Sequence, residues 1–158
     1  MGSLCQRIKG ALQQPNTWTS SWENFFTDMI QRCFHWEEDM HGIHEEMQAL
    51  FPAVTEKVIP RLLRPLETGG REIQPRIVHG DLWDGNTSTD AATYKPIIFD
   101  ASSMYAHNEF ELGAWSLLRH QIYKMYIGAY QEYFPISAPK EDVDDRLILY
   151  RLYVGPAG

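Results

Sequence analysis

The stretch from Thr19 to Met40 constrains the fold most, because its apolar residues recur with the period of an α-helix. They follow the spacing i, i+3, i+4, i+7, i+8, i+11 and i+12, at Trp22, Phe25, Phe26, Met29, Ile30, Cys33 and Phe34. This spacing places them on one face of a helix. Such an apolar stripe more often packs in a protein core than binds a cofactor. Ser20 and Glu23 have the spacing of a capping box, which predicts the start of the helix.

Helical patterns also dominate the rest of the chain. Further helices are predicted at 42–51, 53–67, 108–119, 122–134 and 142–153. Pro52 and Pro60 are expected to break or kink the second region, and Gly155 and Pro156 to stop the last helix. The fold class is therefore predicted to be mostly α, in the α+β class.

A small central β hairpin is predicted among these helices. Short strands are indicated at 76–79 and 95–100, and the polar segment between them fits the connection of a hairpin. The apolar run Ile97, Ile98 and Phe99 predicts a second strand that is buried on both faces.

Composition limits the domain count and the partners. The chain has 158 residues, enough for one domain, and its formal net charge is −7. That charge argues against a nucleic-acid or anionic-membrane face. No apolar run reaches the ~18 residues of a membrane span. With only two cysteines, Cys5 and Cys33, a reducing, cytoplasmic location is expected. Residues 1–18 are a poorly patterned segment, and the domain is expected at 19–158.

Two short loops carry residues suited to phosphoryl transfer. Asp81 and Asn86 have the Dx4N spacing of a kinase catalytic loop, and Asp100 directly follows an apolar strand. A carboxylate can accept the proton of an attacking hydroxyl, while amide and carboxylate oxygens are ligands that Mg²⁺ accepts. His79 is expected to brace the loop backbone. Taken alone, the Dx4N pattern would more often mark an ordinary turn.

The segments "VHGDLWDGN", "PIIFDASSMYAHNEFELG" and "NTWTSSWENFF" resemble the fructosamine/ketosamine-3-kinase family, in particular its fungal protein-ribulosamine 3-kinase-like members. The resemblance covers about residues 15–153. It implies the C-terminal lobe of a protein-kinase-like fold related to aminoglycoside phosphotransferases. It also implies ATP-dependent phosphorylation of the 3-hydroxyl of ketosamines on amines or glycated proteins, with ATP and Mg²⁺.

The resemblance also assigns expected roles by position. Asp81 is expected to be the general base, and Asn86 and Asp100 the Mg²⁺ ligands. Trp83 would face the sugar or its amine, although a buried packing ring is an equal alternative. Glu111 would brace the catalytic loop, the alternative being a helix N-terminal carboxylate. The roles of His107, Glu109 and Asp84 stay open.

The chain departs from the family pattern in two ways. "DASS" stands at 100–103 where the family commonly has "DPAS". Only Lys9 and Lys57 precede Asp81, and no Gly-rich phosphate loop occurs, so the N-terminal lobe is expected to be absent. The family also normally continues in helix past "LYRLYVGPAG", so the last helix is expected to be cut short. The isolated chain is therefore expected to be weak or inactive, with an exposed lobe interface that favours self-association. The alternatives are a non-catalytic binding module and a phosphotransferase for another small alcohol.

The histidines His35, His41 and His44 lie among acidic residues, but their spacing is not that of a known zinc site. A solvated helix end and turn is the preferred interpretation of this segment.

Overall fold

The computed structural model describes residues 8–9, 12–13, 17–115 and 124–154, and within them the fold is mostly helical with small antiparallel sheets. The α-helices are α1 (Trp22–His41), α2 (Glu45–Ala53), α3 (Ile59–Leu63), α4 (Phe110–Trp115), α5 (Lys124–Tyr133) and α6 (Val143–Val154). The strands are β1 (Ile8–Lys9), β2 (Leu12–Gln13), β3 (Arg76–Val78), β4 (Thr87–Thr89), β5 (Pro96–Ile98) and β6 (Met104–Ala106). The mostly helical prediction is confirmed. The predicted stop at Gly155 and Pro156, residues 116–123 and most of residues 1–16 lie outside the described residues.

Helix α1 confirms the predicted stripe but begins one residue later than predicted. Its N-cap is Ser21 rather than Ser20, and the Ser21 hydroxyl accepts a hydrogen bond from the Asn24 amide at 3.4 Å. The carboxylate of Glu67 accepts the Trp22 amide at 2.9 Å and the Ser21 hydroxyl at 3.1 Å. Glu67 therefore satisfies amides at the positive end of the helix from a distant part of the sequence.

The second helical region continues past both prolines. Helices α2 and α3 are joined by a π-helical turn at Val54–Val58, in which the Ile59 amide donates to the Val54 carbonyl. Pro52 lies inside α2 and Pro60 lies in the first turn of α3. The prolines do not break the region, and the helix is instead distorted by a π turn between them.

The strands do not pair as predicted. Strand β3 pairs antiparallel with β6, with Val78 opposite Met104, while β4 pairs with β5, with Thr87 opposite Ile98. The predicted hairpin between 76–79 and 95–100 is therefore wrong. In the observed hairpin, β4 lies in the segment that was expected to be only a connection, and it pairs with β5, which lies in the predicted second strand.

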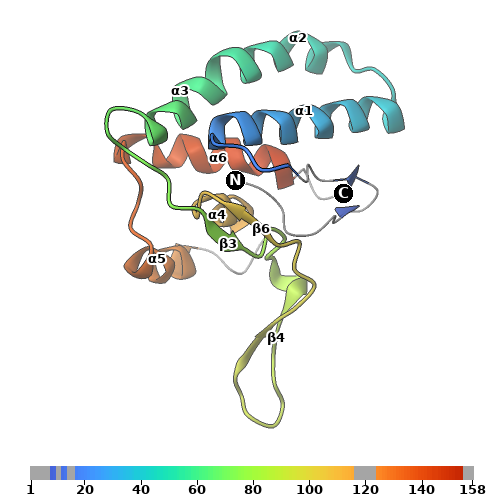
Figure 1. Cartoon of the computed structure of the whole chain (residues 1–158). Coiled ribbons are helices and arrows are strands. Elements are labelled where there is room, and N and C mark those ends of the chain that lie inside the picture. Colours follow the sequence, from blue (N-terminus) through green and yellow to red (C-terminus); the bar gives the residue numbers. More distant parts are fainter. Residues whose placement is uncertain (1–7, 10–11, 14–16, 116–123, 155–158) are drawn as a thin grey trace.

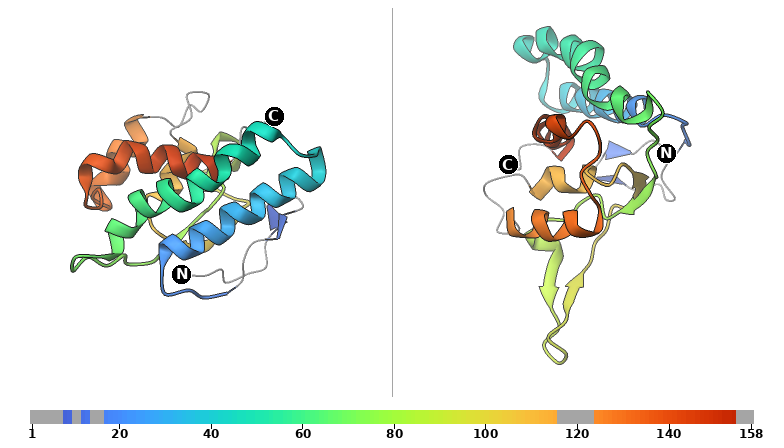
Figure 2. Two further views of the ribbon diagram at one scale, coloured as in Figure 1. Left: turned by 90° about the horizontal axis from the view of Figure 1, so that it is seen from above. Right: turned by 90° about the vertical axis from the view of Figure 1, so that its left-hand side faces the viewer.

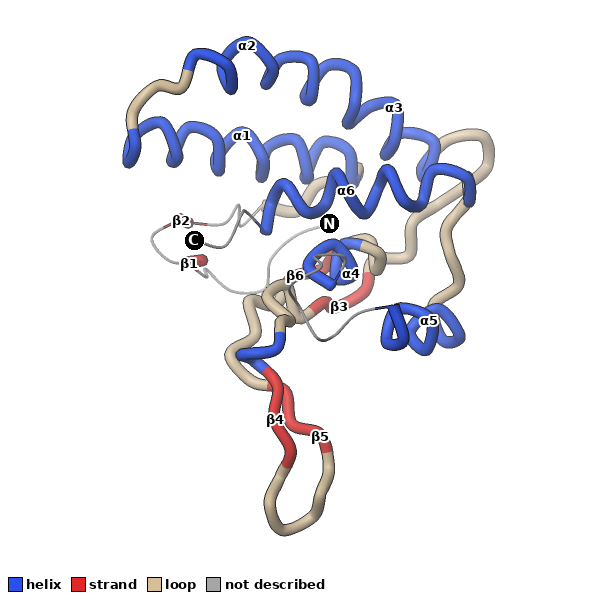
Figure 3. Tube along the Cα trace, turned by 180° about the vertical axis from the view of Figure 1, so that it is seen from behind, coloured by secondary structure: helices blue, strands red, loops and turns tan. Residues whose placement is uncertain are grey.

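The β4–β5 hairpin also departs from the predicted burial. It projects away from the helices as an isolated ribbon (Figures 1 and 3). Ile97, Ile98 and Phe99 are all exposed, Ile98 to 60%. A two-stranded ribbon has no second layer to cover either face, so an apolar run gives no burial here.

Helices α1, α3 and α6 enclose the main core. Helix α1 contacts α3 and α6, and Figure 2 shows these helices running alongside one another. Aromatic rings fill the space between them: Trp22, Phe26, Phe110 and Tyr150 lie with ring centroids 5.4–6.3 Å apart, mostly edge to face. Such geometry is the favourable one for aromatic pairs. No described helix has both the length and the hydropathy needed to cross a membrane.

Helix α4 lies very close to α6 at Gly113. A Cβ atom added there would stand 2.7 Å from Tyr150 Cβ and 3.1 Å from the Tyr150 carbonyl carbon. We expect Gly113→Ala to destabilise the fold by about 1–3 kcal/mol, because the backbone of α6 must move. Gly128→Ala is the matched control, since nothing lies within 4 Å of its added Cβ. Urea unfolding that shows equal stability for both variants would contradict this close approach.

Candidate active site

The first loop of the candidate site begins where β3 ends. Val78, His79 and Gly80 are buried, and Gly80 has a φ of +77°. A Cβ atom at Gly80 would stand 2.5 Å from the Ser102 carbonyl oxygen. Position 80 therefore requires glycine both for its backbone conformation and for the close approach of the second loop.

Asp81 and Asn86 are in direct contact. The Asn86 side-chain amide donates to the Asp81 carbonyl at 2.8 Å and to its carboxylate at 3.2 Å. Asn86 is buried within a 3₁₀ turn at Asp84–Asn86. Both of these hydrogen bonds use the amide nitrogen of Asn86 and not its amide oxygen.

Two hydrogen bonds tie the segment of Asp100 to the first loop. The Phe99 amide donates to the Asn86 carbonyl at 3.1 Å, and His79 Nε2 donates to the Phe99 carbonyl at 3.0 Å. Asp100, the next residue, has a φ of +57° and is exposed. A positive φ is uncommon for a residue other than glycine, and residues with such conformations cluster at functional sites. The structure thus brings Asp81, Asn86 and Asp100 into adjoining loops.

Glu111 of α4 lies beneath the first loop. Its buried carboxylate accepts hydrogen bonds from the backbone amides of His79 and Gly80. Burial raises the pKa of Glu111, and the two amide hydrogen bonds oppose that change. His79 Nδ1 is buried and has no hydrogen-bond partner among the described residues. The backbone at the base of the loop is therefore held by a side chain from a neighbouring helix.

Trp83 lies at the surface of the loop. Its side chain is 45% exposed, and a Cβ atom at Gly85 would stand 2.4 Å from its indole ring. The ring therefore covers Gly85 and leaves a large part of its surface open. Contact of Trp83 with a sugar stays a prediction.

One further residue that supports the loop, Trp115, was not predicted from the sequence. Trp115 Nε1 donates to the Leu82 carbonyl at 2.9 Å, which holds the loop from the side of α4. A buried tryptophan needs a partner for its N–H, but the sequence does not show which carbonyl lies within reach.

His107 and Glu109 belong to a buried polar network behind α4. Arg146 pairs with Glu109 at 2.7 Å, and both side chains are almost fully buried. Trp22 Nε1 donates to the Tyr150 hydroxyl at 2.9 Å, and the oxygen of that hydroxyl lies 2.8 Å from His107 Nδ1. His107 Nε2 lies 2.9 Å from the Ser137 hydroxyl, so a neutral imidazole can donate from one ring nitrogen and accept at the other.

Because His107 is buried in this network, we expect the stability of the fold to decrease at acidic pH. Burial, with a smaller effect of Arg146, lowers the pKa of His107 to about 4, although the charge of Glu109 opposes this. In the unfolded chain the pKa is about 6.5, so only the unfolded state gains this proton as the pH falls from 6.5 to 4. We expect the free energy of unfolding to fall by about 2 kcal/mol more in the wild type than in His107→Gln between pH 7.5 and pH 5.

Urea unfolding at these two pH values measures the difference. Glu111, whose pKa is raised, acts in the opposite direction but is present in both chains, so the comparison cancels its effect. Equal pH dependence in the two chains would show that His107 is protonated in the folded state.

The donor set of the two loops fits a magnesium–nucleotide site. Asn86 offers an amide oxygen and Asp100 an exposed carboxylate, which are oxygen ligands of the kind Mg²⁺ prefers. The described residues contain no cluster of three or more His, Cys, Asp or Glu side chains that could hold a metal. Two protein ligands are nevertheless the usual number where nucleotide phosphates and water supply the rest.

Comparisons with known proteins agree with one another. Residues 2–155 match the family model described as fructosamine kinase. The chain is 36% identical over 145 residues to the ketosamine-3-kinase of Mus musculus, covering 91% of this chain and 43% of the relative. It is 29% identical over 153 residues to the chloroplastic protein-ribulosamine 3-kinase of Oryza sativa subsp. japonica, covering 91% of this chain and 39% of the relative.

A solved structure shares the fold. It is a "Putative fructosamine-3-kinase" from Haemophilus somnus 129PT, with a TM-score of 0.69 and 21% identity, covering 97% of this chain and 47% of that chain. The chain thus spans less than half the length of each of these three relatives. Because the family model matches residues 2–155 of its 158 residues, the chain belongs to the fructosamine kinase family.

Proposed function

We propose that this chain is the catalytic lobe of a kinase-like phosphotransferase that transfers the γ-phosphoryl group of ATP to the 3-hydroxyl of ketosamines. The observation that carries the proposal is the joining of the two loops: Asn86 holds Asp81, while the residue before Asp100 is hydrogen-bonded to both Asn86 and His79. Positioning is the main contribution of a protein to this reaction, and these contacts fix relative positions. The names of the relatives support ketosamines, on amines or glycated proteins, as the substrate class.

Each residue has one role in the proposed step. Asp81 accepts the proton of the sugar hydroxyl as its oxygen bonds to the γ-phosphorus and the bond from that phosphorus to the β,γ-bridging oxygen breaks, releasing ADP. Asn86 and Asp100 would hold Mg²⁺, which would supply positive charge to the phosphates when bound. Trp83 offers an aromatic face to the sugar or its amine. His79 and Glu111 keep the backbone of the loops in place.

The surface beside these loops supports weak activity of the chain alone. Ile77 shortly before the first loop, and Ile97, Ile98 and Phe99 just before Asp100, are exposed. Exposed apolar side chains beside both loops favour a covering layer, which we propose is a second lobe or a second copy of the chain. An uncovered site is open to water, and water weakens the electrostatic contribution to catalysis. A cytoplasmic location is part of the same proposal.

The test is transfer of labelled phosphate from Mg²⁺·ATP to a ribulosyl- or fructosyl-lysine peptide. We expect slow transfer by the wild-type chain and none above background by Asp81→Ala, with folding of both checked by circular dichroism. Excess choline or an amino sugar should not compete with the peptide. Competition would indicate a phosphotransferase for another alcohol, and no transfer by folded protein would indicate a non-catalytic binding module.

A further inference from the structure

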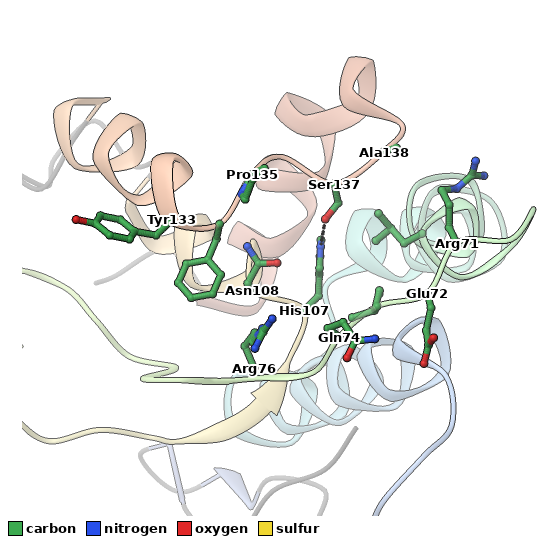
Figure 4. Close-up of a pocket in the computed structure, with 13 residues that line it drawn as sticks. Arg71, Glu72, Gln74, Arg76, His107, Asn108, Tyr133, Pro135, Ser137 and Ala138 are labelled. Carbon is green, nitrogen blue, oxygen red and sulfur yellow. Dashed lines mark hydrogen bonds between the residues drawn. The ribbon is translucent and has the colours of Figure 1, made fainter.

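A hollow lies at the end of the β3–β6 strand pair that is away from the candidate active site. Strand β3 runs from Arg76 to Val78 and leads into the first loop, while Arg76 pairs with Ala106 at the far end of β6. A cavity of about 410 Å³ opens at this far end (Figure 4). It lies between the segment 71–76, the start of the α4 region and the connection from α5 to α6. This volume is within the range of small-molecule sites.

One buried donor and one exposed guanidinium lie in the wall of this cavity. The side-chain nitrogen of Asn108 is buried without a hydrogen-bond partner among the described residues. The Arg76 guanidinium forms no ion pair or hydrogen bond with any residue in the described ranges and stands 5.8 Å from the centroid of the Phe134 ring. A buried amide donor without an acceptor is costly, so an oxygen-rich ligand here would remove a penalty.

The remaining charges do not compete for this position. Figure 4 shows the Glu72 carboxylate and the Arg71 guanidinium pointing away from the group formed by Arg76, Asn108 and His107. Arg71 Nε is already occupied by the Pro65 carbonyl. Burial lowers the pKa of His107 to about 4, and both of its ring nitrogens already have partners in Tyr150 and Ser137. Arg76 is therefore the charged side chain of this group.

We propose that this cavity binds a small organic anion, with a carboxylate or phosphate group on Arg76 and Asn108 and a flat body against Phe134. A guanidinium presents paired donors that match both kinds of oxyanion. Phe134 stacks on Tyr130 with centroids 5.0 Å apart, which gives the apolar wall a fixed orientation. The site is separate from the proposed catalytic loops and does not depend on their activity.

Calorimetric titration of the whole chain at low salt tests the proposal. Phenyl phosphate and benzoate are the probes, and phenol is the neutral counterpart of the same ring. We expect at least one of the two anions to bind with a dissociation constant of about 1 mM or lower, and phenol to bind at least tenfold more weakly. The stronger of the two anions identifies the preferred group.

Variants locate the binding. Arg76→Gln should weaken the anion at least tenfold, and Asn108→Leu should do the same, while Arg32→Gln on the distant α1 surface should leave binding unchanged. Arg76 is exposed, so its variant is expected to keep the fold. The proposal is overturned if neither anion binds, if phenol binds equally well, or if Arg76→Gln binds like the wild type.

Discussion

Replacing Arg146 by methionine is expected to destabilise the fold by about 3–5 kcal/mol, because the change leaves the Glu109 carboxylate buried without its charge partner. Arg146 is 0% exposed and makes two hydrogen bonds to Glu109 and one each to the carbonyls of Ser137 and Pro139. These contacts join α6 to the start of α4 and to the connection that precedes α6. Urea unfolding at pH 7 measures the loss.

A matched arginine serves as the control. Arg61 pairs with Asp142 at 2.9 Å, but its side chain is 60% exposed. Arg61→Met should therefore cost less than about 1 kcal/mol. The double variant Glu109→Met, Arg146→Met should recover part of the loss, because no unpaired charge remains. A loss at Arg146 no larger than that at Arg61 would show that the buried pair is not held as the structure has it.

Glu111→Gln is expected to lower phosphoryl transfer by about 100-fold, because a shift of the loop by about 1 Å is enough for such a loss. The glutamine can present an N–H group to the amides of His79 and Gly80, which already donate to the carboxylate. One buried donor then lacks an acceptor, which should cost about 1–3 kcal/mol of stability.

The kinetic constants separate a positioning role from simple loss of folded protein. Glu111 does not belong to the proposed ligand set, so kcat should fall while KM for Mg²⁺·ATP stays close to the wild-type value. Glu132→Gln on the exposed side of α5 is the control and should change neither. An unchanged kcat in Glu111→Gln would contradict the proposed role of Glu111 in positioning the catalytic loop.

The sequence predicted what depends on local periodicity and missed what depends on distant contacts. Helix α1 could be predicted because its stripe recurs over several turns. The pairing of β3 with β6 could not, because strands of three residues carry too little pattern to choose a partner. The Ile97–Phe99 run shows only that the side chains are apolar, and burial also requires a second layer.

The same division applies to the candidate site. The types and order of Asp81, Asn86 and Asp100 are visible in the sequence, and their roles stay predictions. The contacts that hold them come from elsewhere in the chain: Glu111 and Trp115 reach the loop from α4. Arg146 lies between Asp145 and the apolar run that begins at Leu147, and this position does not indicate that it is the most buried charge of the described residues.

The central claim is that the two loops form one site for a metal–nucleotide complex. Electron paramagnetic resonance of Mn²⁺, titrated with and without ADP, tests it directly and does not require turnover. We expect ADP to strengthen Mn²⁺ binding in the wild-type chain. Asp100→Asn and Asn86→Ala should each weaken this ADP-dependent binding at least tenfold, while Asp28→Asn on the surface of α1 should not. Equal ADP-dependent binding by all four proteins, or none by the folded wild type, would contradict the claim.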